Sequence, residues 1–263
     1  MLGILIWLLT ALTAALFVVK RWWFPAAISE HARLFDSQFT YTLTVMGAVF
    51  VAAQAALGWV ILRGRRRQQA AYSEGNARLE VIWTATTAVL FLGVVALSTG
   101  VFASVHITKP PADALRVEAV GKQFAWNFRY PGVDGKYGAL DVKQINDASG
   151  NPFGIDEKDA TGKDDIVSAA LRVPAGRDVV VTLRARDVIH NFFVRELRLK
   201  QDLVPGMAIP LHFRAETPGI YEVACSELCG LGHHLMKTSL IVMPKDEFET
   251  WLQQMDEQLK GQQ

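Results

Sequence analysis

The sequence predicts a membrane-anchored protein in which an N-terminal transmembrane α-helical region precedes an all-β domain outside the membrane. Two observations predict this fold class. The first third of the chain contains three long stretches without a charged residue, and from about residue 114 short β-type runs alternate with turn residues. The chain is 51% hydrophobic and 20% charged, which is too apolar for a disordered protein.

The three uncharged stretches cover residues 1–19, 39–62 and 81–105. Each is close to or above the ~20 residues that a helix needs to cross a membrane. The second stretch ends in a basic cluster, Arg63, Arg65, Arg66 and Arg67, and the positive-inside rule places the following loop in the cytoplasm. We therefore expect the third span to run outward and residues beyond about 106 to lie in the periplasm.

The first stretch has two interpretations. It lacks the positive n-region and the clear cleavage site of a secretory signal, yet Lys20 and Arg21 follow it on the side that this topology makes external. The flanking residues favour a retained span over a cleaved signal. The chain is therefore expected to have three transmembrane helices, or two if the first stretch is a signal. Glu30, His31 and Arg33 are interpreted as solvated charges in the outer loop.

The external part is predicted to be a β-sandwich or β-barrel. The expected strands cover residues 115–120, 171–173, 179–183, 209–213, 221–223 and 238–242. A polar excursion is expected at 141–165 and an amphipathic closing helix at 247–259. The predicted organisation is a transmembrane region at 1–106, a β domain at 107–246, and a helix with a tail at 247–263.

The chemistry of the chain is concentrated in residues 225–236. Cys225, Cys229, His233 and Met236 offer thiol, imidazole and thioether groups, which together suit copper. Structural zinc would prefer four strong ligands, and a methionine is a poor fourth one. The alternative is a disulfide between Cys225 and Cys229, with His233 as an incidental surface residue.

One further ligand is expected upstream, and the best candidate is His190 in the segment DVIHNFF. Taken alone, a histidine between apolar and aromatic residues is more often a core residue with its hydrogen bonds satisfied. His212 and His234 are interpreted as bystanders.

The pattern C-S-E-L-C-G-x-x-H-x-x-M, preceded by D-V-I-H-N-F and K-Q-D-L-V-P-G, resembles subunit II of the haem-copper cytochrome c oxidases from about residue 35 to the end. The resemblance implies a cupredoxin-like Greek-key β-barrel that holds a binuclear copper centre, CuA. By this resemblance Cys225 and Cys229 are the bridging thiolates and His190 and His233 the terminal imidazoles. Met236 supplies an axial thioether, and Glu227 binds through its backbone carbonyl.

The resemblance also implies the function and the partners. Electrons would pass from a periplasmic c-type cytochrome through CuA to haem in subunit I, which reduces oxygen to water and pumps protons. The Glu227 side chain would reach a magnesium ion shared with subunit I, and subunit III is a further expected partner. The implied location is the bacterial inner membrane, as a multi-pass protein surrounded by lipid.

Two other places match the family. Glu80 corresponds to a glutamate thought to begin a proton path into subunit I, although a carboxylate at a membrane boundary can also simply reach to water. Phe124 and Trp126 are the candidates for the residues where electrons enter, and Phe124 stands where the family usually has tryptophan. Together with Phe128 and Tyr130, these aromatic residues are also typical of one apolar strand face.

Charge and the remaining motifs exclude other classes. Residues 1–104 carry 8 Lys/Arg against 4 Asp/Glu, and residues 105–263 carry 19 against 22, so no basic surface for nucleic acid is expected. The external part has a net charge of −3 (19 minus 22), which predicts that the cytochrome donor presents a basic face. The acidic residues of this chain that could attract it include Asp134, Asp141, Asp187 and Asp202. No Cys-x-x-Cys-His motif is present, so a cytochrome c would be a separate polypeptide.

Two related functions fit the sequence less well. A quinol oxidase subunit would lack Cys225 and Cys229. A membrane-tethered copper-delivery protein would need one span only and would have no use for Glu80.

Overall fold

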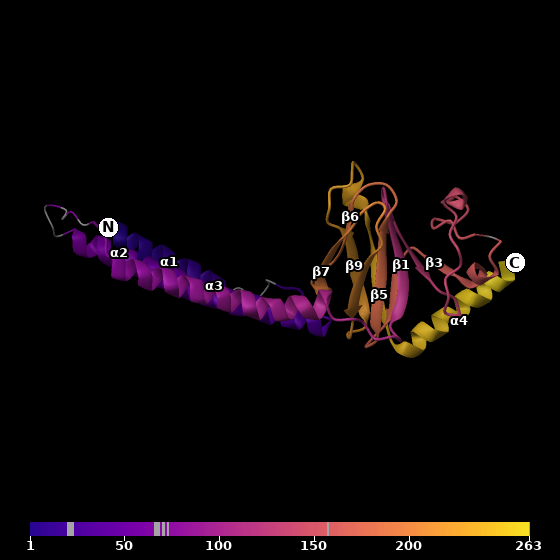
Figure 1. Cartoon of the computed structure of the whole chain (residues 1–263), viewed down its shortest axis with the longest axis horizontal. Coiled ribbons are helices and arrows are strands. Elements are labelled where there is room, and N and C mark those ends of the chain that lie inside the picture. The colour runs from indigo at the N-terminus through magenta and orange to yellow at the C-terminus, as the bar shows by residue number, and fades with distance from the viewer. Residues whose placement is uncertain (20–23, 66–68, 70–71, 73, 157, 263) are drawn as a thin grey trace. The chain divides into compact units, whose positions relative to one another are not determined.

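The computed structural model describes residues 1–19, 24–65, 69, 72, 74–156 and 158–262 (Figure 1). Four of the basic residues used to predict the membrane orientation lie outside the described residues: Lys20, Arg21, Arg66 and Arg67. The chain forms two compact units. A helical unit contains Met1–Pro25 and Leu34–Ala103, and a β unit contains Ala26–Arg33 and Ser104–Gln263. The β unit thus includes a short segment that precedes the second apolar stretch in the sequence.

Three helices account for the three uncharged stretches: α1 (Leu2–Val19), α2 (Glu30–Gly64) and α3 (Ala77–His106). All three are long and apolar enough to cross a membrane, as expected. The side chain of Asn76 caps α3 by accepting a hydrogen bond from the Leu79 N–H at 3.2 Å. This cap places Glu80 in the first helical turn, where a negative charge is favourable.

The expectation that Glu30, His31 and Arg33 lie in a loop is wrong, because α2 begins at Glu30. Ser29 explains the early start, since its hydroxyl accepts a hydrogen bond from the Ala32 N–H at 3.0 Å and caps the helix.

Helix α1 packs closely against α2 at two glycines, Gly58 and Gly3. The Trp7 indole lies over Gly58, where a Cβ atom would come within 2.2 Å of the ring nitrogen, and the indole N–H donates to the Ala55 carbonyl at 3.1 Å. Gly3 similarly gives room to Leu62. Close approach at small residues is the usual way in which transmembrane helices associate.

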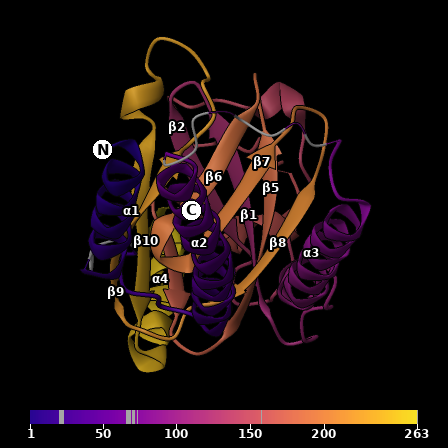
Figure 2. The same ribbon diagram turned by 90° about the vertical axis from the view of Figure 1, so that its left-hand side faces the viewer.

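The β unit contains two five-stranded sheets, whose strands can be followed in Figures 1 and 2. The first sheet has the order β3 (Ile166–Ser168), β2 (Ala125–Tyr130), β1 (Leu115–Lys122), β5 (Asp178–Ala185), β8 (Ile209–Arg214). The second has the order β4 (Leu171–Pro174), β10 (Lys237–Met243), β9 (Gly219–Cys225), β6 (His190–Val194), β7 (Leu199–Leu203). The six expected strands are present as β1, β4, β5, β8, β9 and β10, and β2 carries the expected aromatic strand face. The strands β3, β6 and β7 were not expected from the sequence.

One core joins the two sheets, and its side chains come from alternate positions of the strands. Val181 and Phe213 from the first sheet and Phe192 and Val223 from the second are fully or almost fully buried in it. The expected apolar face on β2 is confirmed for Trp126, Phe128 and Tyr130, which are all buried.

The expected closing helix is α4 (Lys245–Gln262), slightly longer than predicted. Phe248 is buried in the core of the β unit, and Trp251 packs edge-on against Tyr130 with ring centroids 5.1 Å apart. The C-terminal helix is therefore an integral part of the β unit.

The polar excursion lies between β2 and β3, and its described residues include two short 3₁₀ helices, Val142–Gln144 and Ala160–Asp164. The buried Arg129 anchors it, since its guanidinium donates to the carboxylate of Asp165, to Glu118 at 3.1 Å and to the Gly138 carbonyl at 2.6 Å. Arg129 thus ties Gly138 and Asp165, which lie on either side of most of the excursion, to the β unit.

Candidate metal centre

The candidate ligands lie at the start of one strand, at the end of a neighbouring strand, and in the loop that follows the second strand. His190 is the first residue of β6, and Cys225 is the last residue of β9. These strands are neighbours, with Phe192 opposite Cys225, so the fold places His190 beside Cys225. The loop after β9 carries the other candidates, and the Cys225 N–H closes this loop by donating to the Met236 carbonyl at 3.0 Å.

The structure brings all six predicted copper ligands together. The distances are 3.9 Å between the Sγ atoms of Cys225 and Cys229, 4.0 Å from Cys225 Sγ to His190 Nδ1, 3.2 Å from Cys225 Sγ to the Glu227 carbonyl oxygen, 3.6 Å from Cys229 Sγ to His233 Nδ1, and 3.7 Å from Cys229 Sγ to Met236 Sδ. The ligand atoms of His190, Cys225 and Cys229 all lie within 4.8 Å of one another.

This geometry fits a soft metal, and Cys225 and Cys229 do not form the disulfide that was the alternative interpretation. Both cysteines are free thiols, and their 3.9 Å separation is far above the ~2.05 Å of a disulfide bond. A metal–thiolate bond is about 2.3 Å long, so two sulfurs at this separation can bind the same ion. Thiolates, imidazoles and a thioether are the donors that select copper over harder cations.

Burial affects the protonation of Cys229. His190, Cys225, Cys229 and Met236 are buried, and His233 is half-buried. Burial, together with the neighbouring Cys225 sulfur, raises the pKa of Cys229 to about 11. The Cys229 thiol therefore keeps its proton at neutral pH until a cation displaces it, so that metal binding would release protons.

The groups around the ligands were only partly visible in the sequence. Asp187 accepts a hydrogen bond from His190 Nε2 at 2.7 Å, and the buried Asn191 bonds both Ser226 and Asp202. Gly121 on β1 leaves room for the His190 ring, because a Cβ atom there would lie 3.3 Å from its Cδ2. Asn191 and Ser226 adjoin ligands in the sequence, whereas nothing local marks Gly121.

The two aromatic candidates occupy different environments. Phe124 is 37% exposed, and its ring packs on the ligand loop at Gly232, where a Cβ atom would come within 2.4 Å of it. Trp126 is only 3% exposed and packs edge-on against His190 with ring centroids 6.5 Å apart. Of the two, Phe124 is the one that a partner protein can touch.

The acids expected to attract a donor are distributed over two regions. Asp187 and Asp202 lie at the cluster, and Asp134 and Asp141 lie between β2 and β3. Burial acts to raise the pKa of Asp187, but hydrogen bonds from Gln123, His190 and Val188 outweigh it and lower the pKa.

Asp147, also between β2 and β3, pairs with both Lys122 and Arg186, and these hydrogen bonds lower its pKa to about 2. Its charge is therefore already balanced within the β unit.

Glu80 belongs to the helical unit, in the first turn of α3.

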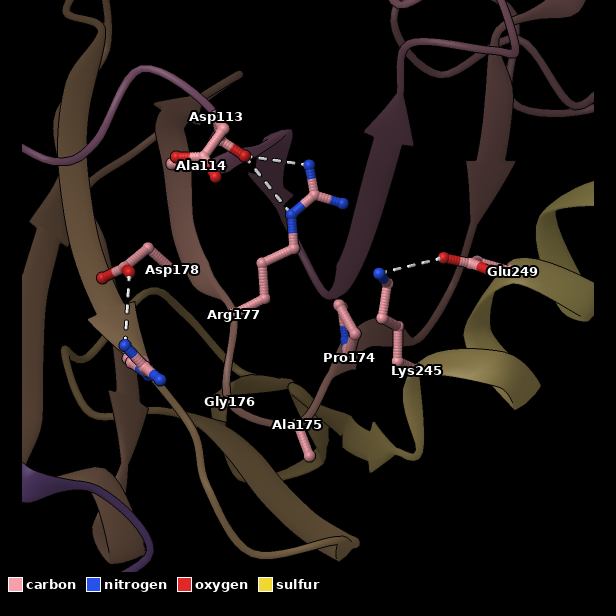
Figure 3. Close-up of a pocket in the computed structure, with 10 residues that line it drawn as sticks. Asp113, Ala114, Pro174, Ala175, Gly176, Arg177, Asp178, Lys245 and Glu249 are labelled. Atoms are coloured by element: carbon pink, nitrogen blue, oxygen red, sulfur yellow. Dashed lines mark hydrogen bonds and ion pairs between the residues drawn. The ribbon is translucent and has the colours of Figure 1, made fainter.

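A surface cavity of about 560 Å³ lies at the opposite end of β5 from the cluster (Figure 3). Arg177 there donates to the backbone carbonyl of Asp113 at 2.9 Å, and Lys245 pairs with Glu249 at 3.7 Å. Asp178 lies 3.8 Å from Arg214 and also accepts from His212 Nε2 at 2.8 Å. Both acidic and basic residues line this cavity, and none of the predicted ligands is among them.

Comparison with known proteins agrees with this architecture. A family model described as the periplasmic domain of cytochrome c oxidase subunit II matches residues 115–243. The alternative cytochrome c oxidase subunit 2 of Bradyrhizobium diazoefficiens is 36% identical over 255 residues, which cover 95% of this chain and 90% of that relative. The cytochrome c oxidase subunit 2 of Thermostichus vulcanus is 33% identical, over 88% of this chain and 77% of that relative.

Among solved structures, the periplasmic domain of cytochrome oxidase subunit II of Bradyrhizobium japonicum covers 58% of this chain and 99% of its own length, at 27% identity and a TM-score of 0.43.

Three apolar helices followed by a cupredoxin-like β domain with a cysteine–histidine cluster define a membrane-anchored protein of the copper-binding type. The chain belongs to the cytochrome c oxidase subunit II family. It is thus a subunit of a haem-copper terminal oxidase whose C-terminal domain lies in the periplasm.

Proposed function

We propose that electrons enter a proton-pumping terminal oxidase through this chain. It accepts them from a periplasmic c-type cytochrome and passes them to haem in subunit I, where oxygen is reduced to water. The observation that supports this most directly is the convergence of two thiols, two imidazole Nδ1 atoms and a thioether within about 4 Å of their neighbours. The oxidase complex would lie in the bacterial inner membrane.

The proposed centre is a binuclear CuA site in a domain that covers residues 107–246 and is followed in the sequence by the helix and tail at 247–263. Cys225 and Cys229 would be shared between the two ions, with His190 and His233 as outer ligands and Met236 as a weak axial ligand. When bound, such a centre takes up and releases one electron at a time. The ends of β6 and β9 hold His190 and Cys225 in fixed positions, which keeps the reorganisation on electron transfer small.

Electrons would enter at Phe124 and reach the ligand loop through its contact with Gly232. Trp126 lies deeper, against His190, and would act behind the surface. The side chain of Glu227 is exposed beside the cluster, which suits a magnesium ion shared with subunit I. Its backbone carbonyl would serve the copper centre.

Glu80 would begin a proton path toward subunit I at the cytoplasmic end of α3, and subunit III would complete the complex. A carboxylate at a membrane boundary can hold and release a proton in this way.

The proposal is tested on the full-length chain, purified on its own in detergent and loaded with copper, because the haem and copper of subunit I would obscure both readouts in the assembled oxidase. We expect two coppers per chain and an intense purple colour from thiolate-to-copper charge transfer. Cys225→Ser and Cys229→Ser are expected to abolish both, because a hydroxyl does not bridge metals as a thiolate does. The matched control is His234→Ala, which removes an exposed neighbour of His233 and leaves the six ligands intact. A single copper, or colourless zinc, in the wild-type chain would disprove the binuclear centre.

A further inference from the structure

Asp187 lies directly beside the candidate ligand His190 and accepts three hydrogen bonds. Its Oδ1 atom is 2.7 Å from His190 Nε2 and 2.8 Å from the Val188 N–H nitrogen. Its Oδ2 atom accepts from the Gln123 N–H at 2.7 Å. Because a backbone N–H can only donate, both oxygens of Asp187 act as acceptors.

These contacts select one form of the His190 ring. A neutral imidazole carries one N–H donor and one lone pair. With a carboxylate oxygen accepting at Nε2, the hydrogen is on Nε2 and the lone pair is on Nδ1, which faces Cys225 Sγ at 4.0 Å. The ring is fully buried between Trp126 and the backbone of Gly121, so its orientation is constrained by packing as well.

The same carboxylate reaches the exposed aromatic residue. The Gln123 N–H binds Asp187, and the Gln123 side-chain amide donates to the carbonyl of Cys229 in the ligand loop. The next residue, Phe124, packs on that loop at Gly232. One side chain thus connects a candidate ligand with the surface where we propose that electrons enter.

We propose that Asp187 is a positioning residue of the metal centre, which holds His190 in the Nε2–H tautomer and fixes the segment Gln123–Phe124 against the ligand loop. This inference rests on the proposed function, because it assigns a role toward the copper ions. A carboxylate that accepts from the distal N–H makes an imidazole a stronger donor. A stronger donor favours the oxidised metal, so Asp187 is expected to lower the reduction potential.

The tautomer can be tested without any substitution. In the metal-free, ¹⁵N-labelled full-length chain in detergent micelles, long-range ¹H–¹⁵N correlation spectra distinguish the two neutral imidazole forms. We expect the resonances of His190 to show hydrogen on Nε2. Hydrogen on Nδ1 would overturn the proposal, because the ring would then present no lone pair toward Cys225.

The effect on the metal is tested with Asp187→Asn in the copper-loaded full-length chain. Loss of a carboxylate behind a ligating histidine typically weakens metal binding 10–100-fold, and we expect a loss in that range together with a higher reduction potential. The matched control is Asp178→Asn, since Asp178 makes the same carboxylate–imidazole contact with His212 at the other end of β5. The control is expected to leave copper affinity and potential unchanged.

The outcomes separate the two hypotheses. Two coppers in the wild-type chain, with unchanged affinity and potential in Asp187→Asn, would overturn the role of Asp187 and leave the proposed function standing. Fewer than two coppers in the wild-type chain would overturn the proposed function itself. If Asp187→Asn fails to fold, as judged by near-ultraviolet circular dichroism, the tautomer measurement on the wild-type chain still decides the proposal.

Discussion

Met236 is the weakest donor among the six candidate ligands. Its thioether lies 3.7 Å from Cys229 Sγ and is buried, so it is placed to adjust a copper centre without holding it together. We expect Met236→Leu to retain both coppers and to raise the reduction potential, measured by redox titration of the visible absorption. Met207→Leu, at an exposed methionine, serves as the control. Loss of copper in Met236→Leu would show instead that the thioether is essential for binding.

Phe124 stands where the family resemblance leads us to expect tryptophan, and this difference predicts a kinetic effect. Its ring is exposed and touches the ligand loop, so a larger aromatic surface there should improve contact with a donor. Phe124→Trp is expected to raise kcat/KM several-fold for a soluble c-type cytochrome, and Phe124→Leu to lower it. Steady-state oxidation of the reduced cytochrome measures both. If both variants match the wild type, electrons do not enter at this position.

The packing of α1 on α2 bears on whether the first apolar stretch is a signal or a span. The Trp7 indole fits over Gly58 and hydrogen-bonds to α2, which a cleaved signal would not need. We expect N-terminal sequencing and intact mass of the purified protein to show that residues 1–19 are retained. A mature protein that begins beyond residue 19 would contradict this.

A pair of substitutions in α2 tests the same interface. Gly58→Leu should lower the thermal midpoint of the isolated chain in detergent, because the new side chain displaces Trp7. Gly47→Leu should leave it unchanged, because nothing lies within 4 Å of a Cβ atom at that position.

The excursion between β2 and β3 depends on one buried ion pair. Arg129 and Asp165 are both buried, and Asp165 is one of two carboxylates, with Glu118, that balance the buried guanidinium, so its removal leaves part of that charge uncompensated in the interior. Asp165→Ala should reduce the free energy of unfolding by about 3–5 kcal/mol. Glu249→Ala breaks the exposed pair with Lys245 and should cost less than about 1 kcal/mol. Equal effects in denaturant titrations of the two variants would show that Arg129 is not the anchor.

The division of the chain into a helical unit and a β unit predicts that proton and electron functions can be separated. Glu80 lies in the helical unit, and every candidate copper ligand lies in the β unit. Glu80→Gln in the assembled oxidase is expected to leave the copper spectrum intact and to slow oxygen consumption, because an amide, unlike a carboxylate, does not take up and release a proton near neutral pH. Glu74→Gln, just before α3, is the matched control. Unchanged turnover would mean that Glu80 only reaches to water.

Much of the architecture was predictable because it depends on local composition. The three helices, six of the strands and α4 follow from uncharged runs and short periodic patterns. The strand β7 was missed because LKQDL alternates weakly, and β3 was missed because it has only three residues. For β6, the sequence HNFFV begins with polar residues, and its pairing with β7 and β9 is what makes it a strand.

The sequence by itself determined the anchor, the class of β domain and the set of candidate ligands, because charge, hydrophobic runs and a twelve-residue motif are properties of neighbouring residues. Only the tertiary structure decided that His190 lies beside Cys225, that the two thiols are free, that Trp126 is buried while Phe124 is exposed, and that Asp187 contacts His190 Nε2. These features depend on β6 pairing with β9 and on the β1–β2 turn packing against the ligand loop. The contact of His190 with Cys225 joins residues 35 positions apart, that of Gln123 with Cys229 joins residues 106 positions apart, and no local pattern specifies either of them.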